Sequence, residues 1–125
     1  MKKIEFEFYR RSNGKVEFVE FLKKIPRKDQ IKLLATINNI QEYGISIAIK
    51  EQWVKKLDKN LYELRSKVSN NIQRVIYFHY ENNRYVITHG FTKKTQKTPL
   101  KELKHGIALR NEYLKIKGDL KDDKR

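Results

Sequence analysis

The chain has 125 residues, with 29 Lys and Arg against 15 Asp and Glu, and it contains no cysteine. Its 38% hydrophobic residues are enough for one compact core, and the lack of cysteine excludes disulfides and thiolate metal sites. A formal net charge of +14 favours polyanionic partners, so RNA, DNA and acidic proteins are all candidates.

Neither a membrane segment nor a cofactor site is expected. No apolar run approaches the roughly 20 residues that a membrane-spanning helix needs. The N-terminus alternates charged and apolar residues instead of forming the apolar core of a signal peptide. Three histidines are a weak basis for a metal site. We therefore expect a cytoplasmic protein that has no membrane partner, no metal and no cofactor.

The first part of the chain predicts one strand and two helices. Apolar and polar residues alternate over 3–9, which is typical of a strand with one buried face. Apolar residues then recur at helical spacing from Phe18 to Ile25, where Pro26 interrupts the pattern. A second helix is expected over 27–43, and Gly44 suits its C-terminal cap. The positions expected to face the core, themselves or through their neighbours, are Ile31, Leu34, Ile37 and Ile40.

The second part predicts an antiparallel meander and a last helix. Residues 45–60 are interpreted as a loop or an irregular strand. Polar breaks rich in asparagine separate the apolar runs that follow, as tight hairpin turns require. Thr98 and Pro99 match the N-cap and first position of a helix. The expected ranges are 61–68, 72–80 and 84–91 for the strands, 98–115 for the helix and 116–125 for a flexible tail. The last helix is expected to bury Leu100, Leu103, Ile107 and Leu114.

This order of elements, β-α-α-β-β-β-α, predicts a single α+β domain over residues 1–115. The two consecutive helices are expected to form a hairpin on one face of an antiparallel sheet. The other face would remain partly open, and we expect the functional site there.

Charged residues of the three later strands are expected to share that face. Because side chains alternate along a strand, Glu63 and Arg65 point to the same side. His89 does so with Phe91 on the last strand, and Lys93 lies just beyond. Arg74 opens the middle strand. Such a group of cations around one carboxylate could match the charge of a phosphodiester.

Three sequence motifs carry a resemblance to a known family. LYELR (61–65), RVIYF (74–78) and HGFTKKTQKTP (89–99) resemble the HigB branch of the RelE/ParE toxin superfamily, often described as phage Gp49-like proteins. The resemblance runs from about residue 4 to residue 114. It implies a RelE-like fold and a toxin of a type II toxin-antitoxin pair that enters the ribosomal A site and cuts mRNA. It also implies a cognate antitoxin, of helix-turn-helix type and HigA-like.

Metal-free RNA cleavage needs a base, positive charge and an acid. Arg65 and Arg74 fit the task of stabilising charge, because guanidinium groups offer forked donors to phosphate oxygens. Lys93 lies where several superfamily members place a proton-transferring side chain, while Glu63 and His89 are the other candidates for acid and base. Glu63 could instead form an ion pair with Arg65, and His89 could be a packed core histidine.

Other residues are candidates for holding the RNA. Lys94 and Lys97 lie in the basic loop before the last helix and could contact phosphates. Tyr77 and Phe91 could stack on unpaired bases, although aromatic residues in strands are more often part of the core.

Three functions remain open at this point. The first is a ribosome-dependent mRNA endonuclease that arrests translation and growth, with the ribosome and mRNA as partners. The alternative is a ParE-like gyrase poison without RNase activity, although that branch generally lacks the combination of the ELR arginine and the lysine loop. A non-catalytic RNA-binding protein is the third, since charge alone suffices for binding.

Overall fold

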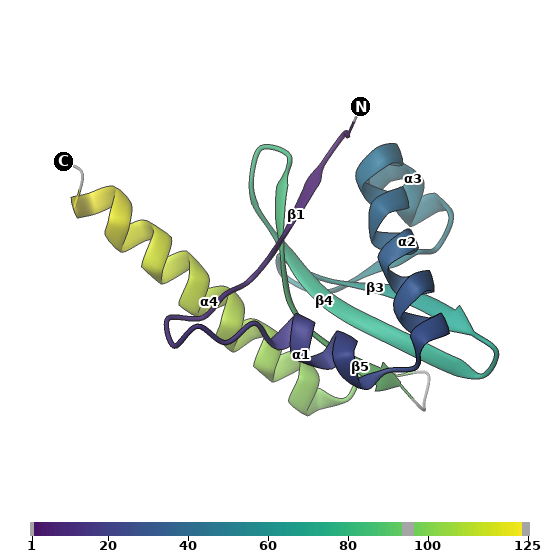
Figure 1. Ribbon diagram of the computed structural model, residues 1–125. Helices are drawn as coiled ribbons and strands as arrows, with labels where there is room; N and C mark the ends of the chain where they lie inside the picture. Colours follow the sequence, from purple (N-terminus) through teal and green to yellow (C-terminus); the bar gives the residue numbers. More distant parts are fainter. Residues whose placement is uncertain (1, 94–96, 124–125) are drawn as a thin grey trace.

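The computed structural model describes residues 2–93 and 97–123, which form a five-stranded sheet with helices packed on both faces (Figure 1). The elements in chain order are β1 (Glu5–Phe8), α1 (Glu17–Lys24), α2 (Arg27–Tyr43), α3 (Ile45–Lys50), β2 (Val54–Asp58), β3 (Leu61–Val68), β4 (Asn71–Glu81), β5 (Arg84–Lys93) and α4 (Leu100–Asp123).

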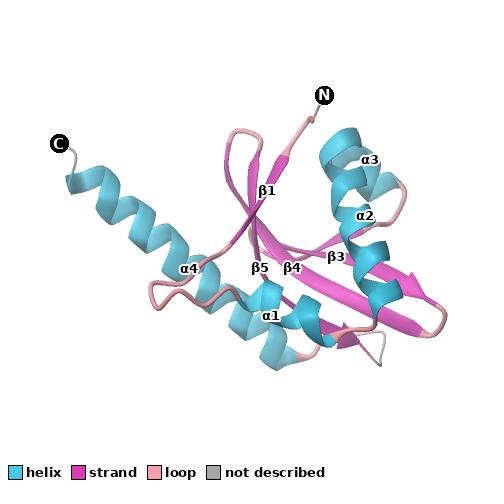
Figure 2. Cartoon of the chain, viewed as in Figure 1, coloured by secondary structure: helices cyan, strands magenta, loops and turns pink. Residues whose placement is uncertain are grey.

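The strands lie in the order β1-β5-β4-β3-β2 (Figure 2). β1 is parallel to β5, and every other neighbouring pair is antiparallel. The α+β class is therefore confirmed, but the prediction of a wholly antiparallel sheet is wrong. The physical reason is that three helices separate β1 from β2 in the chain, so no tight hairpin fixes the direction of β1.

Most predicted elements are confirmed, and the second helix has the predicted bounds. The interpretation of residues 45–60 as a loop or irregular strand is confirmed for β2, whose register with β3 shifts between Lys56 and Asp58, and is wrong for residues 45–50, which form α3. Both elements are short and give no clear periodicity. The predicted helix end at residue 115 is also wrong, since α4 continues to Asp123 through much of the segment expected to be a flexible tail.

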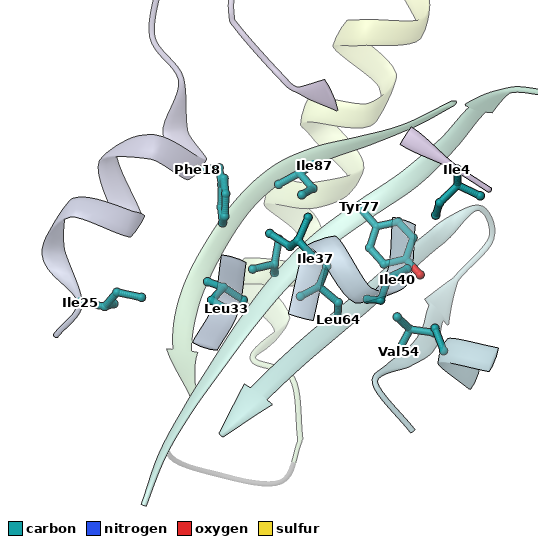
Figure 3. Packing of buried hydrophobic residues seen from close by; sticks show 12 residues of the cluster. Ile4, Phe18, Ile25, Leu33, Ile37, Ile40, Val54, Leu64, Tyr77 and Ile87 are labelled. Atoms are coloured by element: carbon teal, nitrogen blue, oxygen red, sulfur yellow. The ribbon is translucent and has the colours of Figure 1, made fainter. Parts of the chain in front are cut away.

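One core cluster lies between the sheet and the helices α1 to α3 (Figure 3). Ile37 and Ile40 are buried as predicted, whereas Ile31 and Leu34 are exposed because Leu33 takes the inward position. Gly44 ends α2 with a φ of 89°, a conformation that L side chains rarely adopt. Strand residues in this cluster include Leu64, Val75, Tyr77 and Ile87.

A second cluster lies between α4 and the opposite face of the sheet. The buried residues of α4 are Leu109 and Tyr113, while Leu100 and Leu114, expected in the core, are exposed. Gly106 allows the helix to approach closely, since an added Cβ would lie 2.9 Å from Ile76 Cγ2. The strand residues of this cluster are Leu61, Ile76, Phe78, Val86 and Phe91.

Gly106 and Gly118, both in α4, form a matched pair for testing the close packing of this helix against the sheet. Gly→Ala inside a helix gains up to about 1 kcal/mol, and Gly118 has nothing within 4 Å of an added Cβ. Gly118→Ala should therefore stabilise the protein slightly. Gly106→Ala should be less stable than Gly118→Ala by about 1–3 kcal/mol, because the methyl group overpacks the contact with Ile76. Urea unfolding measures both, and equal effects would contradict this packing.

A chain of hydrogen-bonded polar side chains, buried at Asp29 and Gln73, joins α2 to the strands that carry the site. Gln73 Nε2 donates to Asp29 Oδ2 at 2.7 Å, and Thr92 Oγ1 donates to Gln73 Oε1 at 2.8 Å. Gln73 lies beside Arg74 in β4, and Thr92 lies beside Lys93 in β5. These hydrogen bonds therefore hold the backbone at Gln73 and Thr92. Arg74 and Lys93, the next residue in each strand, point to the opposite face of the sheet.

Candidate active site

Strand register brings the predicted charged residues to the face that carries α4. Arg65 pairs with Arg74, and Arg74 pairs with Phe91. One step along β3, Glu63 pairs with Ile76, which contacts α4 in the second core cluster. Because residues two apart on a strand share a face, all of these side chains lie on the α4 side.

Lys93 and Lys55 extend this group along the sheet. Lys93 pairs with Ile72 at the end of β5, two residues along β4 from Arg74. Lys55 of β2 lies directly opposite Glu63 of β3. The charged group thus draws residues from four neighbouring strands.

A buried ion pair lies at the centre of this group. Arg74 Nη1 donates to Glu63 Oε1, and the two side chains are 3% and 0% exposed. The second carboxylate oxygen of Glu63 accepts a hydrogen bond of 2.6 Å from Thr98 Oγ1, just before α4. Arg74 Nε has no hydrogen-bond partner among residues 2–93 and 97–123. The carboxylate is thus engaged on both oxygens, while the buried Nε–H of the guanidinium has no acceptor in that part of the chain.

Lys93 is a buried amine inside this cationic group. It is 3% exposed, and burial lowers the pKa of its ammonium below the ordinary value. The charges of Arg74, Lys55 and Arg65 lower this pKa further, and Glu63 opposes them. A lysine with a lowered pKa is better suited to proton transfer than an exposed one.

Arg65 presents its guanidinium beside a pocket of about 310 Å³. Its Nε donates to Gln52 O at 2.9 Å, which is the one hydrogen bond of this guanidinium within the described chain. Gln52, whose carbonyl oxygen accepts this hydrogen bond, has a φ of 63° and lies in a tight turn between α3 and β2. The terminal N–H groups of Arg65 are available to an anion.

A second pocket, of about 270 Å³, lies on the other side of Glu63. Thr98, whose hydroxyl is bound to Glu63, lines this pocket together with Lys55, Lys56 and Lys97. The pocket is cationic and therefore suits a phosphate chain that continues beyond the Glu63–Arg74 pair.

The structure brings together four of the predicted catalytic residues: Arg65, Arg74, Lys93 and Glu63. Glu63 pairs with Arg74, and its in-strand pairing with Arg65 is not formed. His89 is on the same face, but Ile76 separates it from Glu63 across the sheet, and it lines a different pocket between α1 and α4. The predicted group of five is therefore divided.

The RNA-contact predictions have three different outcomes. Tyr77 and Phe91 are buried in the two core clusters, so the prediction that they stack on bases is wrong for both. Each packs against helices that cover its face of the sheet. Lys97 lines the cationic pocket. Lys94 lies outside the described residues.

Two residues of the site were not predicted. Lys55 belongs to β2, and its place opposite Glu63 follows only once that strand is known. Thr98 was interpreted as a helix cap, yet its hydroxyl donates to Glu63 from a distance of 35 residues in the chain. A contact of that kind depends on how α4 lies on the sheet.

Among residues 2–93 and 97–123, His, Cys, Asp and Glu side chains form no group of three that could hold a metal ion. No helix in those ranges is long and apolar enough to cross a membrane.

The mixed sheet, the helices on one face and the C-terminal helix on the other define an α+β protein consistent with the RelE-like fold. The chain belongs to the family described as Phage derived protein Gp49-like (DUF891), whose sequence model matches residues 20–111. This is a family of RelE/HigB-type toxins associated with toxin-antitoxin systems, which implies an antitoxin partner. None of the curated proteins with which the chain was compared matches it.

Proposed function

We propose that this toxin is a ribosome-dependent mRNA endonuclease that cuts RNA by attack of the 2′-hydroxyl on the adjacent phosphodiester. The observation that carries the proposal is the group of cations around one buried carboxylate: Arg65, Arg74, Lys93 and Lys55 around Glu63. Such a site attracts phosphate, and its charges need not reorganise when negative charge develops in the reaction.

The two arginines would stabilise the phosphorane-like transition state. Arg74 offers its Nε–H, and Arg65 offers its terminal N–H groups beside a pocket. Both guanidiniums are held by protein acceptors, Glu63 Oε1 and Gln52 O respectively. This fixes their orientation before substrate binds, which is how preorganised donors lower a barrier.

In this mechanism the bond between the 2′-oxygen and phosphorus forms as the bond between phosphorus and the 5′-oxygen breaks. The 2′-hydroxyl loses a proton and the departing 5′-oxygen gains one; Lys93 would transfer one of these protons and water the other. Burial and the neighbouring cations lower the pKa of Lys93, which suits a group that must gain and lose a proton. Glu63 has a different role in the proposal, because both of its oxygens already accept hydrogen bonds from Arg74 and Thr98. It acts as a positioning residue that holds Arg74. His89 is left out of the mechanism because it lies in another pocket.

Substitution of Arg65 tests the proposal. We expect Arg65→Ala to lower mRNA cleavage by about 10²–10³-fold, the usual loss when a preorganised donor is removed. The fold should be retained, since Arg65 is half-buried and contributes one hydrogen bond to Gln52. Growth after induction and northern blots of mRNA measure the effect. Lys28→Ala, on the exposed side of α2, removes one charge outside the site and should leave toxicity unchanged.

Three results would contradict the proposal. If Arg65→Ala cleaves mRNA as fast as the parent chain, the site is wrongly assigned. If induction leaves mRNA intact but produces double-strand breaks in DNA, the gyrase-poison alternative applies. If induction has no effect on growth, the non-catalytic RNA-binding alternative gains support.

The antitoxin is proposed to be a helix-turn-helix protein with an acidic or amphipathic segment. A chain with a formal charge of +14 is well neutralised by such a partner. Both chains would act in the cytoplasm, where the ribosome and mRNA are the targets.

A further inference from the structure

A separate pocket of about 240 Å³ lies between α1 and α4, beside β5. Figure 2 shows α1 and the first turns of α4 close to the later part of β5. Three carboxylates line the pocket, from Glu17, Glu20 and Glu102, together with the imidazoles of His89 and His105 and the ammonium of Lys24. Carboxylates outnumber the one lysine, so the pocket is chemically distinct from the cationic site around Glu63.

His89 contributes an unsatisfied hydrogen-bond acceptor to this pocket. Thr88 Oγ1 donates its one hydrogen to Ile76 O at 3.1 Å. The contact of 2.9 Å between Thr88 Oγ1 and His89 Nδ1 must then be donated by Nδ1–H. Burial lowers the pKa of His89 to about 4, so the ring is neutral at physiological pH. Nε2 is thus a bare acceptor, and it has no hydrogen-bond partner within the described chain.

Glu102 places a second acceptor next to the first. Its Oε1 lies 3.5 Å from His89 Nε2, and the two side chains are 19% and 5% exposed. Two acceptors that face each other cannot form a hydrogen bond, and a buried acceptor without a donor is costly. A ligand that donates N–H groups to both His89 Nε2 and Glu102 Oε1 is therefore favoured.

The remaining carboxylates of the pocket already have cationic or imidazole partners. Glu17 accepts from Arg11 at 3.0 Å and lies 2.7 Å from His105 Nε2. Glu20 lies 3.6 Å from Lys15 Nζ. Within the described ranges, the one ion-pair contact of Glu102 is with the imidazole of His89, at 3.5 Å. The acceptors of this pocket that still need a hydrogen-bond donor are therefore His89 Nε2 and the Glu102 carboxylate.

We propose that this pocket binds a guanidinium group that bridges His89 Nε2 and the Glu102 carboxylate. A guanidinium is planar, charged and carries several N–H donors in a fixed fork, so it can serve a neutral and an anionic acceptor together. Phe21, which also lines the pocket, offers an aromatic surface of the kind on which guanidiniums stack. This inference does not depend on RNA cleavage. The guanidinium can come from an arginine of the antitoxin or from a small molecule.

The first test is a titration of the full chain followed by ¹⁵N NMR of the histidine rings. Without ligand, His89 should show the Nδ1–H tautomer. Nα-acetyl-arginine-methylamide should shift the His89 Nε2 signal saturably, and Nα-acetyl-lysine-methylamide should bind at least about tenfold more weakly. Glu102→Gln should weaken arginine binding about tenfold or more. Asp119→Asn removes a charge from an exposed position of the same helix and should leave binding unchanged.

A second arm identifies the source of the group. If Glu102→Gln also weakens binding of the antitoxin encoded beside this chain, and an antitoxin Arg→Lys variant has no additional effect in that background, the ligand is an antitoxin arginine. If the arginine amide binds but antitoxin affinity is unchanged, the ligand is a small molecule. Absence of a saturable shift, an Nε2–H tautomer in the free protein, or equal binding by Glu102→Gln would overturn the proposal. Thermal unfolding of Glu102→Gln checks that the variant is folded.

Discussion

Replacing Arg74 with methionine is expected to abolish toxicity and to lower the free energy of unfolding by about 3–5 kcal/mol. Glu63 is completely buried, so removal of Arg74 breaks the ion pair at its carboxylate and leaves that charge less well compensated by the remaining cations, Lys93 and Lys55. The hydrogen bond from Thr98 remains, but one neutral donor does not replace a guanidinium. Urea unfolding measures the stability, and a growth assay after induction measures the toxicity.

The double variant Glu63→Leu/Arg74→Met separates these two effects. Both charges are removed, so most of the lost stability should return, as it does when buried ion pairs are replaced by apolar residues. Toxicity should not return, because the guanidinium donor is still missing. If the double variant is both stable and toxic, Arg74 has no part in the chemistry. If the double variant is no more stable than Arg74→Met, the buried pair is not the origin of the loss.

Lys93→Met is expected to lower cleavage by about 10²–10⁴-fold, the usual contribution of a positioned proton donor or acceptor. The same variant should unfold at a higher temperature than the parent chain. Burial destabilises the charged ammonium, and methionine fills a similar space without a charge. A residue that costs stability but supports activity is expected in a functional site.

The pH dependence of stability gives an independent test of Lys93. Its pKa is lower in the folded chain than in the unfolded chain, so between the two pKa values the unfolded state binds more protons. Stability in this range should therefore rise with pH in the parent chain, and Lys93→Met should lack that rise. Thermal melts across alkaline pH provide the measurement.

Lys93→Arg distinguishes proton transfer from simple charge. Arginine keeps the positive charge, but its guanidinium does not lose a proton near neutral pH and so cannot act as a proton donor or acceptor. We expect Lys93→Arg to be as inactive as Lys93→Met. Substantial cleavage by Lys93→Arg would mean that Lys93 only supplies charge to the phosphate, and the acid or base would have to be sought elsewhere.

The sequence predicted those parts of the fold that repeat a local pattern several times. α2 has the predicted bounds because it is long and ends at Gly44. α3 was missed because it is too short to show a period, and β2 could not be distinguished from a loop because it is short and exists through its pairing with β3. The end of α4 was missed for another reason. Leu114, Ile116 and Leu120 stay exposed where the helix extends past the sheet (Figure 1), so no core pattern marks that segment.

The site was predicted in part for the same physical reason. Strand alternation predicted that Glu63 shares a face with Arg65 and His89 with Phe91, and the register of the paired strands shows that these faces coincide and include Arg74 and Lys93. Alternation does not give the position of a residue across the sheet, so it could not separate His89 from Glu63. It also could not reveal the hydrogen bond from Thr98, which depends on the placement of α4.

The most direct test of the proposed chemistry is the structure of the RNA ends after induction or after addition of the toxin to translating and non-translating extracts. The account predicts cleavage of mRNA in the translating extract only, with 2′,3′-cyclic phosphate and 5′-hydroxyl ends. A 2′-deoxy substitution at the cleaved nucleotide should block the cut, and the double variant Glu63→Leu/Arg74→Met should leave the mRNA intact. Cleavage of the 2′-deoxy substrate, or intact mRNA accompanied by DNA breaks, would contradict the account.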